Sequence, residues 1–158
     1  MWNERLSTYL NDHLAGAGFA LELLDHLISE APESSDGLPA LRSEILEDRE
    51  QLRALMASHH IDESRVRKAG ARIAEWLAEV KLEADDEDRG PLRRLERLEA
   101  LAIGIEGKIA LWGALEAAAR SNAGLPELNY QGLTQRGRDQ RSRVETLRLQ
   151  AAIAALAD

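Results

Sequence analysis

Apolar side chains recur every three or four residues along most of this chain, and the recurrence breaks at a few short segments rich in polar residues, glycine or proline. This spacing places apolar residues on one face of an α-helix. Ala, Leu, Glu and Arg dominate, and no stretch alternates apolar and polar residues as a half-buried strand would. The pattern predicts an all-α fold with five helices, over about residues 3–30, 38–58, 62–82, 91–121 and 130–157.

Capping residues mark where several of these helices begin. Ser35 or Asp36 is expected to cap the second helix, and Asp62 or Ser64 the third, because short polar side chains accept hydrogen bonds from the free amides of a first turn. Pro91 suits the first position of the fourth helix. Short connections favour antiparallel neighbours, so the first two helices should form one hairpin and the last two another.

The third predicted helix, about 20 residues and roughly 30 Å long, would carry the chain back along the bundle. The fourth helix would then run in the same direction as the second. Two arrangements fit these lengths: a four-helix bundle with one long crossover that is itself helical, and a plain up-down bundle of five helices. In either case, residues 1–158 are expected to form a single domain.

Composition and charge exclude several classes of partner. The chain has no cysteine, so disulfides and thiolate metal sites are excluded. Its net charge of −8 argues against a nucleic-acid partner, which needs a concentrated positive face. The charged N-terminal segment does not have the apolar core of a signal peptide, and no apolar run reaches the ~20 residues of a membrane span. We therefore expect a cytoplasmic protein without membrane contact.

Polar residues interrupt the apolar faces, and these positions are the candidate site. Four helices each place one such residue in mid-face: His13, Asp48, Glu106 and Gln140. Glu99 lies one heptad before Glu106, and Glu44 lies at the edge of the face that contains Asp48. A carboxylate in such a face must be paired, neutralised or bound to a metal, because burying a bare charge is very costly.

In placing these residues within one layer, the chain resembles the ferritin-like superfamily. That resemblance implies a di-metal centre with a Glu from each of two helices and a Glu-x-x-His pair from each of the other two. Glu106 matches a single-Glu position, whereas His13 stands where the other Glu is expected. The second helix offers Asp48 or Glu44 without the histidine, and the last helix has Arg143 in the place of a ligand. An arginine there supplies the positive charge that a metal otherwise would.

Two segments, NDHLAG at residues 11–16 and GIEGKIALW at residues 104–112, resemble small helical proteins of bacteria, and this resemblance implies no particular activity. Three hypotheses for the site stay open. The first is a buried network of ion pairs and hydrogen bonds among His13, Asp48, Arg49, Glu106, Gln140 and Arg143. The second is a bound Fe, Mn or Zn ion with ligands among His13, Glu44, Asp48, Glu99 and Glu106. The third is a small-ligand or acid–base site in which Glu106, with a raised pKa, acts with His13.

No complete catalytic motif occurs, so the function that the sequence favours is a non-enzymatic structural or interaction module. It would act through self-association or a protein partner, because alanines such as Ala151, Ala154 and Ala155 allow close helix packing. The alternative is a metal-binding ferritin-like protein with a redox or storage role. Lys108 is expected at the edge of the apolar face, with its ammonium group reaching solvent.

Overall fold

The computed structural model describes residues 4–33, 36–66, 70–71, 75, 90–121, 124–125 and 128–157. These residues form the helices α1 (Glu4–Glu30), α2 (Leu38–Ser58), α4 (Gly90–Ser121) and α5 (Tyr130–Leu156), and the short 3₁₀ helix η1 (Glu63–Arg65). No strand occurs among them, so the prediction of an all-α fold is confirmed. The bounds of the four α-helices agree with the predicted ranges to within one residue.

The predicted third helix falls mostly outside the described residues. The residues that the structure does describe in this stretch after η1, namely Val66, Gly70, Ala71 and Glu75, are helical. A full-length fifth helix, and with it the choice between the crossover bundle and the up-down bundle, stays a prediction.

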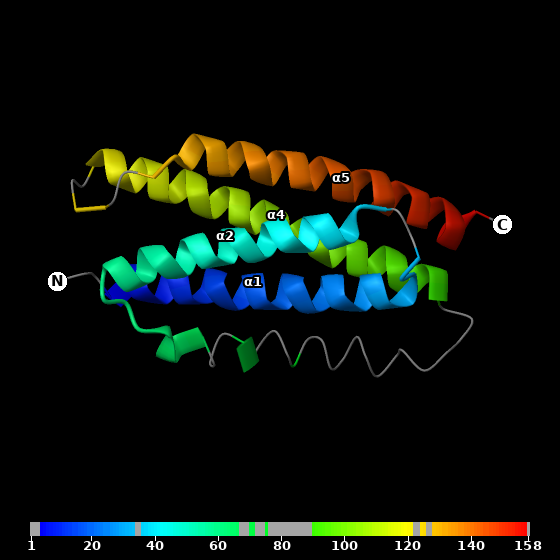
Figure 1. The fold of residues 1–158 in the computed structure, drawn as a ribbon, viewed down its shortest axis with the longest axis horizontal. Coiled ribbons are helices and arrows are strands. Elements are labelled where there is room, and N and C mark those ends of the chain that lie inside the picture. Colours follow the sequence, from blue (N-terminus) through cyan, green and yellow to red (C-terminus); the bar gives the residue numbers. More distant parts are fainter. Residues whose placement is uncertain are drawn as a thin grey trace.

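The four α-helices form two antiparallel hairpins, α1 with α2 and α4 with α5 (Figure 1). α4 also packs against α1, and α2 and α4 run in the same direction, as the connection lengths predict. None of the helices in the described ranges combines the length and apolar character needed to cross a membrane.

Short polar side chains satisfy the free amides where helices begin. The Asp36 carboxylate accepts a hydrogen bond from the Leu38 amide at 3.1 Å, although Gly37, with a φ of 78°, is the residue that adjoins α2. Asp62 accepts one from the Ser64 amide at 2.7 Å and begins η1 rather than a longer described helix. The predicted N-cap of α2 is therefore wrong for Asp36, because Gly37 takes that position, and Ser35 lies outside the described residues. Asp62 is the N-cap of η1, and its role in capping a long third helix stays a prediction.

The core consists of two apolar clusters placed one after the other along the bundle. The first joins the second half of α1 and of α5 to the first half of α2 and of α4, and includes Leu24, Leu27, Leu41, Leu98, Leu101 and Val144. The second occupies the other end of α1, α2 and α4 and includes Leu10, Leu14, Leu52, Leu55, Trp112 and Leu115. What lies between the two clusters is the candidate site.

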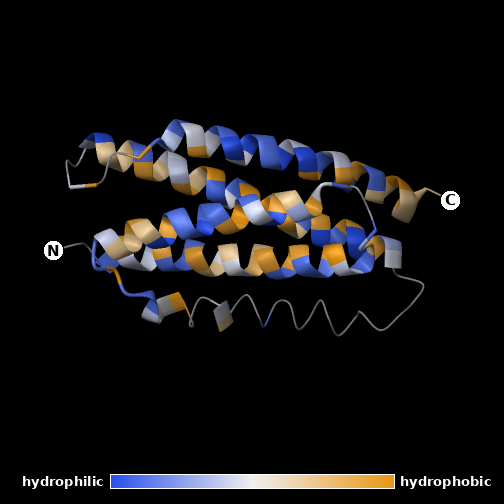
Figure 2. Cartoon of the chain, viewed as in Figure 1, coloured by the Kyte–Doolittle hydropathy of each residue, from blue (hydrophilic) through white to orange (hydrophobic). Residues whose placement is uncertain are grey.

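α5 is the most polar of the four helices, as Figure 2 shows for its first half. It approaches α4 closely at Gly137, where an added Cβ would lie 2.7 Å from Cγ1 of Ile109. Towards α2, by contrast, α5 presents polar side chains, and these form the site described next.

Candidate functional site: a polar layer beside an interhelical cavity

Three polar side chains separate the two apolar clusters, and we call Asp48, Lys108 and Gln140 the polar layer. Each stands between cluster residues of its own helix, as Asp48 does between Ile45 and Leu52. The side chains of Asp48 and Lys108 are 3% and 14% exposed, and Gln140 is fully buried. The Lys108 ammonium donates to Oδ2 of Asp48 and to Oε1 of Gln140, and Nε2 of Gln140 donates to Oδ2 of Asp48 at 3.1 Å.

Two arginines of α5 connect this layer to the surface of α2. Arg143 pairs with Glu44, which also accepts a hydrogen bond from Nε2 of Gln140 at 3.2 Å. Arg136 donates to Glu47 at 2.7 Å and to the main-chain carbonyl of Glu44 at 3.1 Å. Hydrogen bonds and ion pairs therefore connect α5 with α2.

Burial and charge act in opposite directions on the pKa values of the layer. Burial lowers the pKa of Lys108, although the Asp48 carboxylate beside it favours the charged ammonium. The hydrogen bond from Arg143 lowers the pKa of Glu44 in spite of partial burial. Burial therefore opposes the charge of Lys108, and pairing with Asp48 offsets this effect on its pKa only in part.

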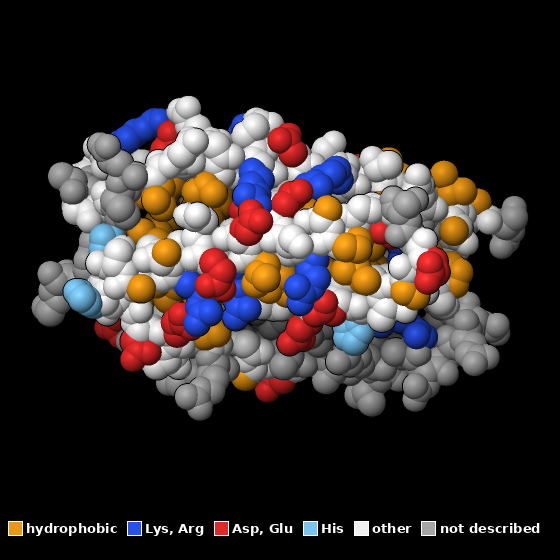
Figure 3. All heavy atoms as spheres, viewed as in Figure 1, with side chains coloured by type: hydrophobic (Ala, Val, Ile, Leu, Met, Phe, Trp, Pro, Cys, Tyr) orange, Lys and Arg blue, Asp and Glu red, His pale blue; other side chains and the backbone are white. Residues whose placement is uncertain are grey.

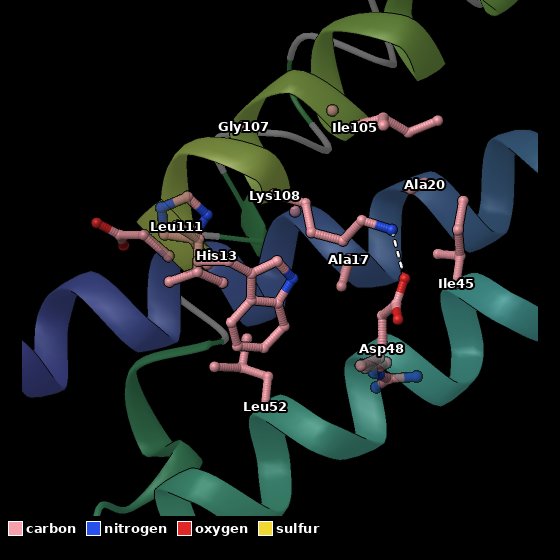
Figure 4. A pocket seen from close by; sticks show the side chains of 15 residues that line it. His13, Ala17, Ala20, Ile45, Asp48, Leu52, Ile105, Gly107, Lys108 and Leu111 are labelled. Carbon is pink, nitrogen blue, oxygen red and sulfur yellow. Dashed lines mark hydrogen bonds and ion pairs between the residues drawn. The ribbon is translucent and has the colours of Figure 1, made fainter. Parts of the chain in front are cut away.

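A cavity of about 170 Å³ lies beside the layer, between α1, α2 and α4 (Figure 4). Lys108 reaches from α4 towards Asp48 of α2, and His13 and Ala17 come from α1. α1 also contributes the small residues Gly16, Ala17 and Ala20 to the lining. Gly104 and Gly107 of α4 also line the cavity, and an added Cβ at either would meet no atom within 4 Å.

Three buried polar atoms on residues that line the cavity have no hydrogen-bond partner among the described residues. They are Nε1 of Trp112, Nε of Arg49 and Oδ1 of Asp48. Oδ1 of Asp48 is in an ion pair with Arg136, whose Nε lies 3.4 Å away without forming a hydrogen bond. Buried polar atoms in native proteins nearly always have a hydrogen-bond partner, so each of these three atoms can still form a hydrogen bond.

His13 lines the cavity from α1, one turn before Ala17. Its ring meets the ring of Tyr9 edge-on, with the ring centres 4.6 Å apart. Burial lowers the pKa of His13, and the charge of Asp12 opposes this only in part. The imidazole is accordingly biased towards its neutral form.

The prediction that Glu106 lies inside the apolar face of its helix is wrong. Its side chain is 59% exposed and pairs with Arg141, with 3.3 Å between the carboxylate and Nε. Glu99 is also exposed and pairs with Arg148 at 3.4 Å. The buried face of α4 is narrower than its sequence suggests: Ile105 is at its centre, and the next residue is rotated by about 100° towards solvent.

Lys108 is the functional residue that the sequence argument missed. It follows Ile105 by three residues and precedes Trp112 by four, and both are buried, so helical spacing already places it on their face. Lys108 was predicted at the edge of the apolar face with its ammonium group in solvent. In the structure the ammonium group points inward and donates a hydrogen bond to Asp48.

The structure brings together part of the predicted network. Asp48 and Gln140 are in direct contact, and Arg143 joins them through Glu44 rather than through Glu106. His13 and Arg49 line the cavity, but neither makes a hydrogen bond to Asp48 or Gln140 in the described residues.

The predicted metal ligands do not converge. His13 and Asp48 face the same cavity, and Glu44 lies on the α5 side of Asp48, whereas Glu99 and Glu106 are at the exposed contact of α4 with α5. In the part of the chain that the structure describes, no three histidine, aspartate or glutamate side chains form a group that could hold a metal ion.

Comparison of the chain with models of protein families, with curated proteins and with solved structures finds no match in any of the three. The similarity to the ferritin-like superfamily therefore rests on helix pattern and residue types alone, and it stays a prediction.

Proposed function

We propose that this helical bundle is a non-enzymatic binding module that holds a small, largely apolar molecule in the cavity between α1, α2 and α4. The observation that carries the proposal is the cavity itself, where α1 supplies the small residues Gly16, Ala17 and Ala20 next to His13. The polar layer forms one of its walls and fixes the relative position of the helices around it.

The size and lining of the cavity support a ligand of this kind. A volume of about 170 Å³ is close to that of an engineered apolar cavity, about 150 Å³, that binds benzene. Leu52, Ile105 and Leu111 provide apolar walls, with a few polar groups at defined positions. Small-molecule sites in helical bundles have this composition.

Lys108 and Asp48 support binding better than catalysis. The ammonium donates to two acceptors, and one carboxylate oxygen accepts from both Lys108 and Gln140. Groups tied together in this way hold a fixed geometry and have little freedom to exchange protons with a ligand. Their role in the proposal is therefore to shape the site.

Titration of the ¹⁵N-labelled protein with toluene, followed through the indole N–H signal of Trp112, tests the proposal. The expected result is a saturable shift of that signal in the wild type and none in Gly107→Leu, whose side chain fills the cavity. Gly113→Leu is the matched control, because Gly113 is on the same helix, is exposed and does not line the cavity. No saturable shift in the wild type, or equal binding by Gly107→Leu, would overturn the proposal.

A second candidate is self-association through the end of α5. Leu149, Ile153 and Leu156 are 50%, 68% and 70% exposed and share one face at helical spacing. Hydrophobic side chains gather at this end of the molecule in Figure 3. Light scattering should then show a dimer that Ile153→Lys dissociates and that Ile103→Lys, an equally exposed position on α4, leaves intact. A monomer at all protein concentrations would exclude this candidate.

The metal-binding ferritin-like alternative has its own test. Elemental analysis of protein purified without a chelator would overturn the proposal above if it found stoichiometric iron, manganese or zinc that a His13→Ala variant had lost.

A further inference from the structure

Among the cationic side chains around the polar layer, Arg49 is the one that the described residues leave without a carboxylate. Arg136 pairs with Glu47, Arg143 with Glu44, and Lys108 with Asp48. Arg49 forms no ion pair in the part of the chain that the structure describes, and its Nε is buried without a hydrogen-bond partner. It is half-buried and lines the cavity from α2.

The same cavity holds a second donor without a partner. Trp112 is 1% exposed, and its indole N–H, which can only donate, is buried and has no acceptor. Trp112 is one helical turn from Lys108, whose ammonium has three N–H groups and uses two of them in the polar layer. Donors without a partner on residues that line the cavity therefore come from both α2 and α4.

Unused acceptors on the wall are fewer. Among the described lining side chains, Oδ1 of Asp48 is the buried acceptor that receives no hydrogen bond, and it is already in an ion pair with Nε of Arg136 at 3.4 Å. A ligand that completes the hydrogen bonding of this cavity must bring oxygen acceptors, and a negative charge would also neutralise Arg49.

We propose that the ligand is a small organic carboxylate, with its apolar body between Leu52, Ile105 and Leu111 and its carboxylate bound by Arg49 and the indole N–H of Trp112. The proposal rests on the proposed function, because it specifies which molecule the cavity takes. A planar guanidinium matches the two oxygens of a carboxylate and binds them as a pair.

The surroundings also set the charge of the ligand. Lys108 is already paired with Asp48, so Arg49 is the lining cation that can neutralise a monoanion. The second charge of a dianion such as a phosphate monoester would find no further cation among the described lining side chains and would be repelled by Asp12. The apolar walls likewise favour an organic acid over an inorganic anion.

Benzoate and benzamide are the probes that test this inference, because they have the same shape and differ in charge. For the wild type, we expect benzoate to bind about tenfold more tightly than benzamide, as measured by titration of the Trp112 indole signal. Arg49→Gln should remove that preference while retaining benzamide binding. Arg53→Gln should keep the preference, because Arg53 is one turn further along α2, pairs with Glu63 and does not line the cavity.

Each outcome decides the inference. If benzamide binds as well as benzoate, or if Arg49→Gln keeps the preference, the carboxylate assignment is wrong, although the cavity still binds a small molecule. If toluene binds and neither benzoate nor benzamide does, the carboxylate assignment also fails. If none of the three probes binds, the proposed function fails with it. Trp112→Phe, followed by the main-chain signals of Gly107 and Leu111, gives an independent check: it retains the ring and should weaken benzoate more than benzamide.

Discussion

At the scale of single residues, burial decides which of the many ion pairs matter. Lys108 and Asp48 are enclosed between two apolar clusters, whereas the Glu106 carboxylate is largely open to water and its partner Arg141 is half-buried. Removing one partner of a buried pair leaves an uncompensated charge, while an exposed pair contributes little. The two pairs therefore provide a direct comparison within one helix.

Lys108→Met should lower the free energy of unfolding by about 3–5 kcal/mol, because it leaves the Asp48 carboxylate buried without its ammonium partner. The double variant Asp48→Leu with Lys108→Met should recover much of that loss, since both desolvation costs disappear. Urea denaturation of the four proteins in this cycle gives the coupling energy. A coupling energy near zero would contradict the assignment of a buried pair.

Glu106→Leu, in contrast, should change the stability by less than about 1 kcal/mol, because the carboxylate is exposed. Its coupling to Arg143 should be close to zero, since Arg143 pairs with Glu44 instead. A loss of several kcal/mol in Glu106→Leu would show that this carboxylate is buried after all.

His13 gives the stability a pH dependence of known sign. Burial lowers its pKa in the folded state, so below its usual pKa of about 6.5 the unfolded chain takes up the proton first. The contribution of neutral His13 to the free energy of unfolding is complete above that pH and is lost as the pH falls through the lower folded-state pKa. Between pH 7 and 5, the wild type should lose stability relative to His13→Gln in urea denaturation.

Variant His26→Gln is the control for this measurement, because His26 is exposed on the same helix. It should follow the wild-type pH profile. Parallel profiles for the wild type and His13→Gln would refute the assigned role of His13.

At the scale of helices, small residues serve two different purposes. Gly107 of α4 lines the cavity, where an added Cβ meets nothing within 4 Å. Gly137 of α5 lies against Ile109, and an added Cβ would come within 2.7 Å of Cγ1 of that side chain. One glycine keeps space open, and the other lets two helices approach.

Gly107→Ala should therefore stabilise the protein by up to about 1 kcal/mol, the difference in helix propensity between the two residues. Gly137→Ala should destabilise it by roughly 1–3 kcal/mol, because the added methyl group overpacks the contact between α4 and α5. Thermal and urea unfolding of both variants measure the difference. Equal effects would show that the contact at Gly137 has room to adjust.

At the scale of the whole molecule, the polar layer divides the core into two clusters that belong to opposite ends of the bundle. Leu24 is fully buried in the first cluster, and Leu115 is almost fully buried in the second. The two ends share the same helices but no packing contact between these side chains. Their contributions to stability are therefore expected to be independent.

Leu24→Ala and Leu115→Ala should each cost about 2–5 kcal/mol, and the double variant should cost their sum to within about 0.5 kcal/mol. Unfolding in urea measures all three. A coupling energy above about 1 kcal/mol would mean that the polar layer transmits packing changes from one cluster to the other.

The sequence by itself determined the helices of this protein. The spacing of Leu and Ile residues and the breaks at glycine, proline and capping residues are local features, and they predict the bounds of α1, α2, α4 and α5 to within one residue. Asp48 and Gln140 were also identified correctly as buried, because each lies at the centre of an apolar face.

Only the tertiary structure decided how these faces meet. Ile105, Glu106 and Lys108 are a few residues apart on α4, and the rotation of that helix against α1 and α5 determines which of them is buried. The cavity and the unpaired Arg49 are likewise invisible in the sequence, because they depend on which partners other helices supply. Local spacing fixes the direction of a side chain within its own helix, but its neighbours, and hence its charge partner, come from residues far away in the chain.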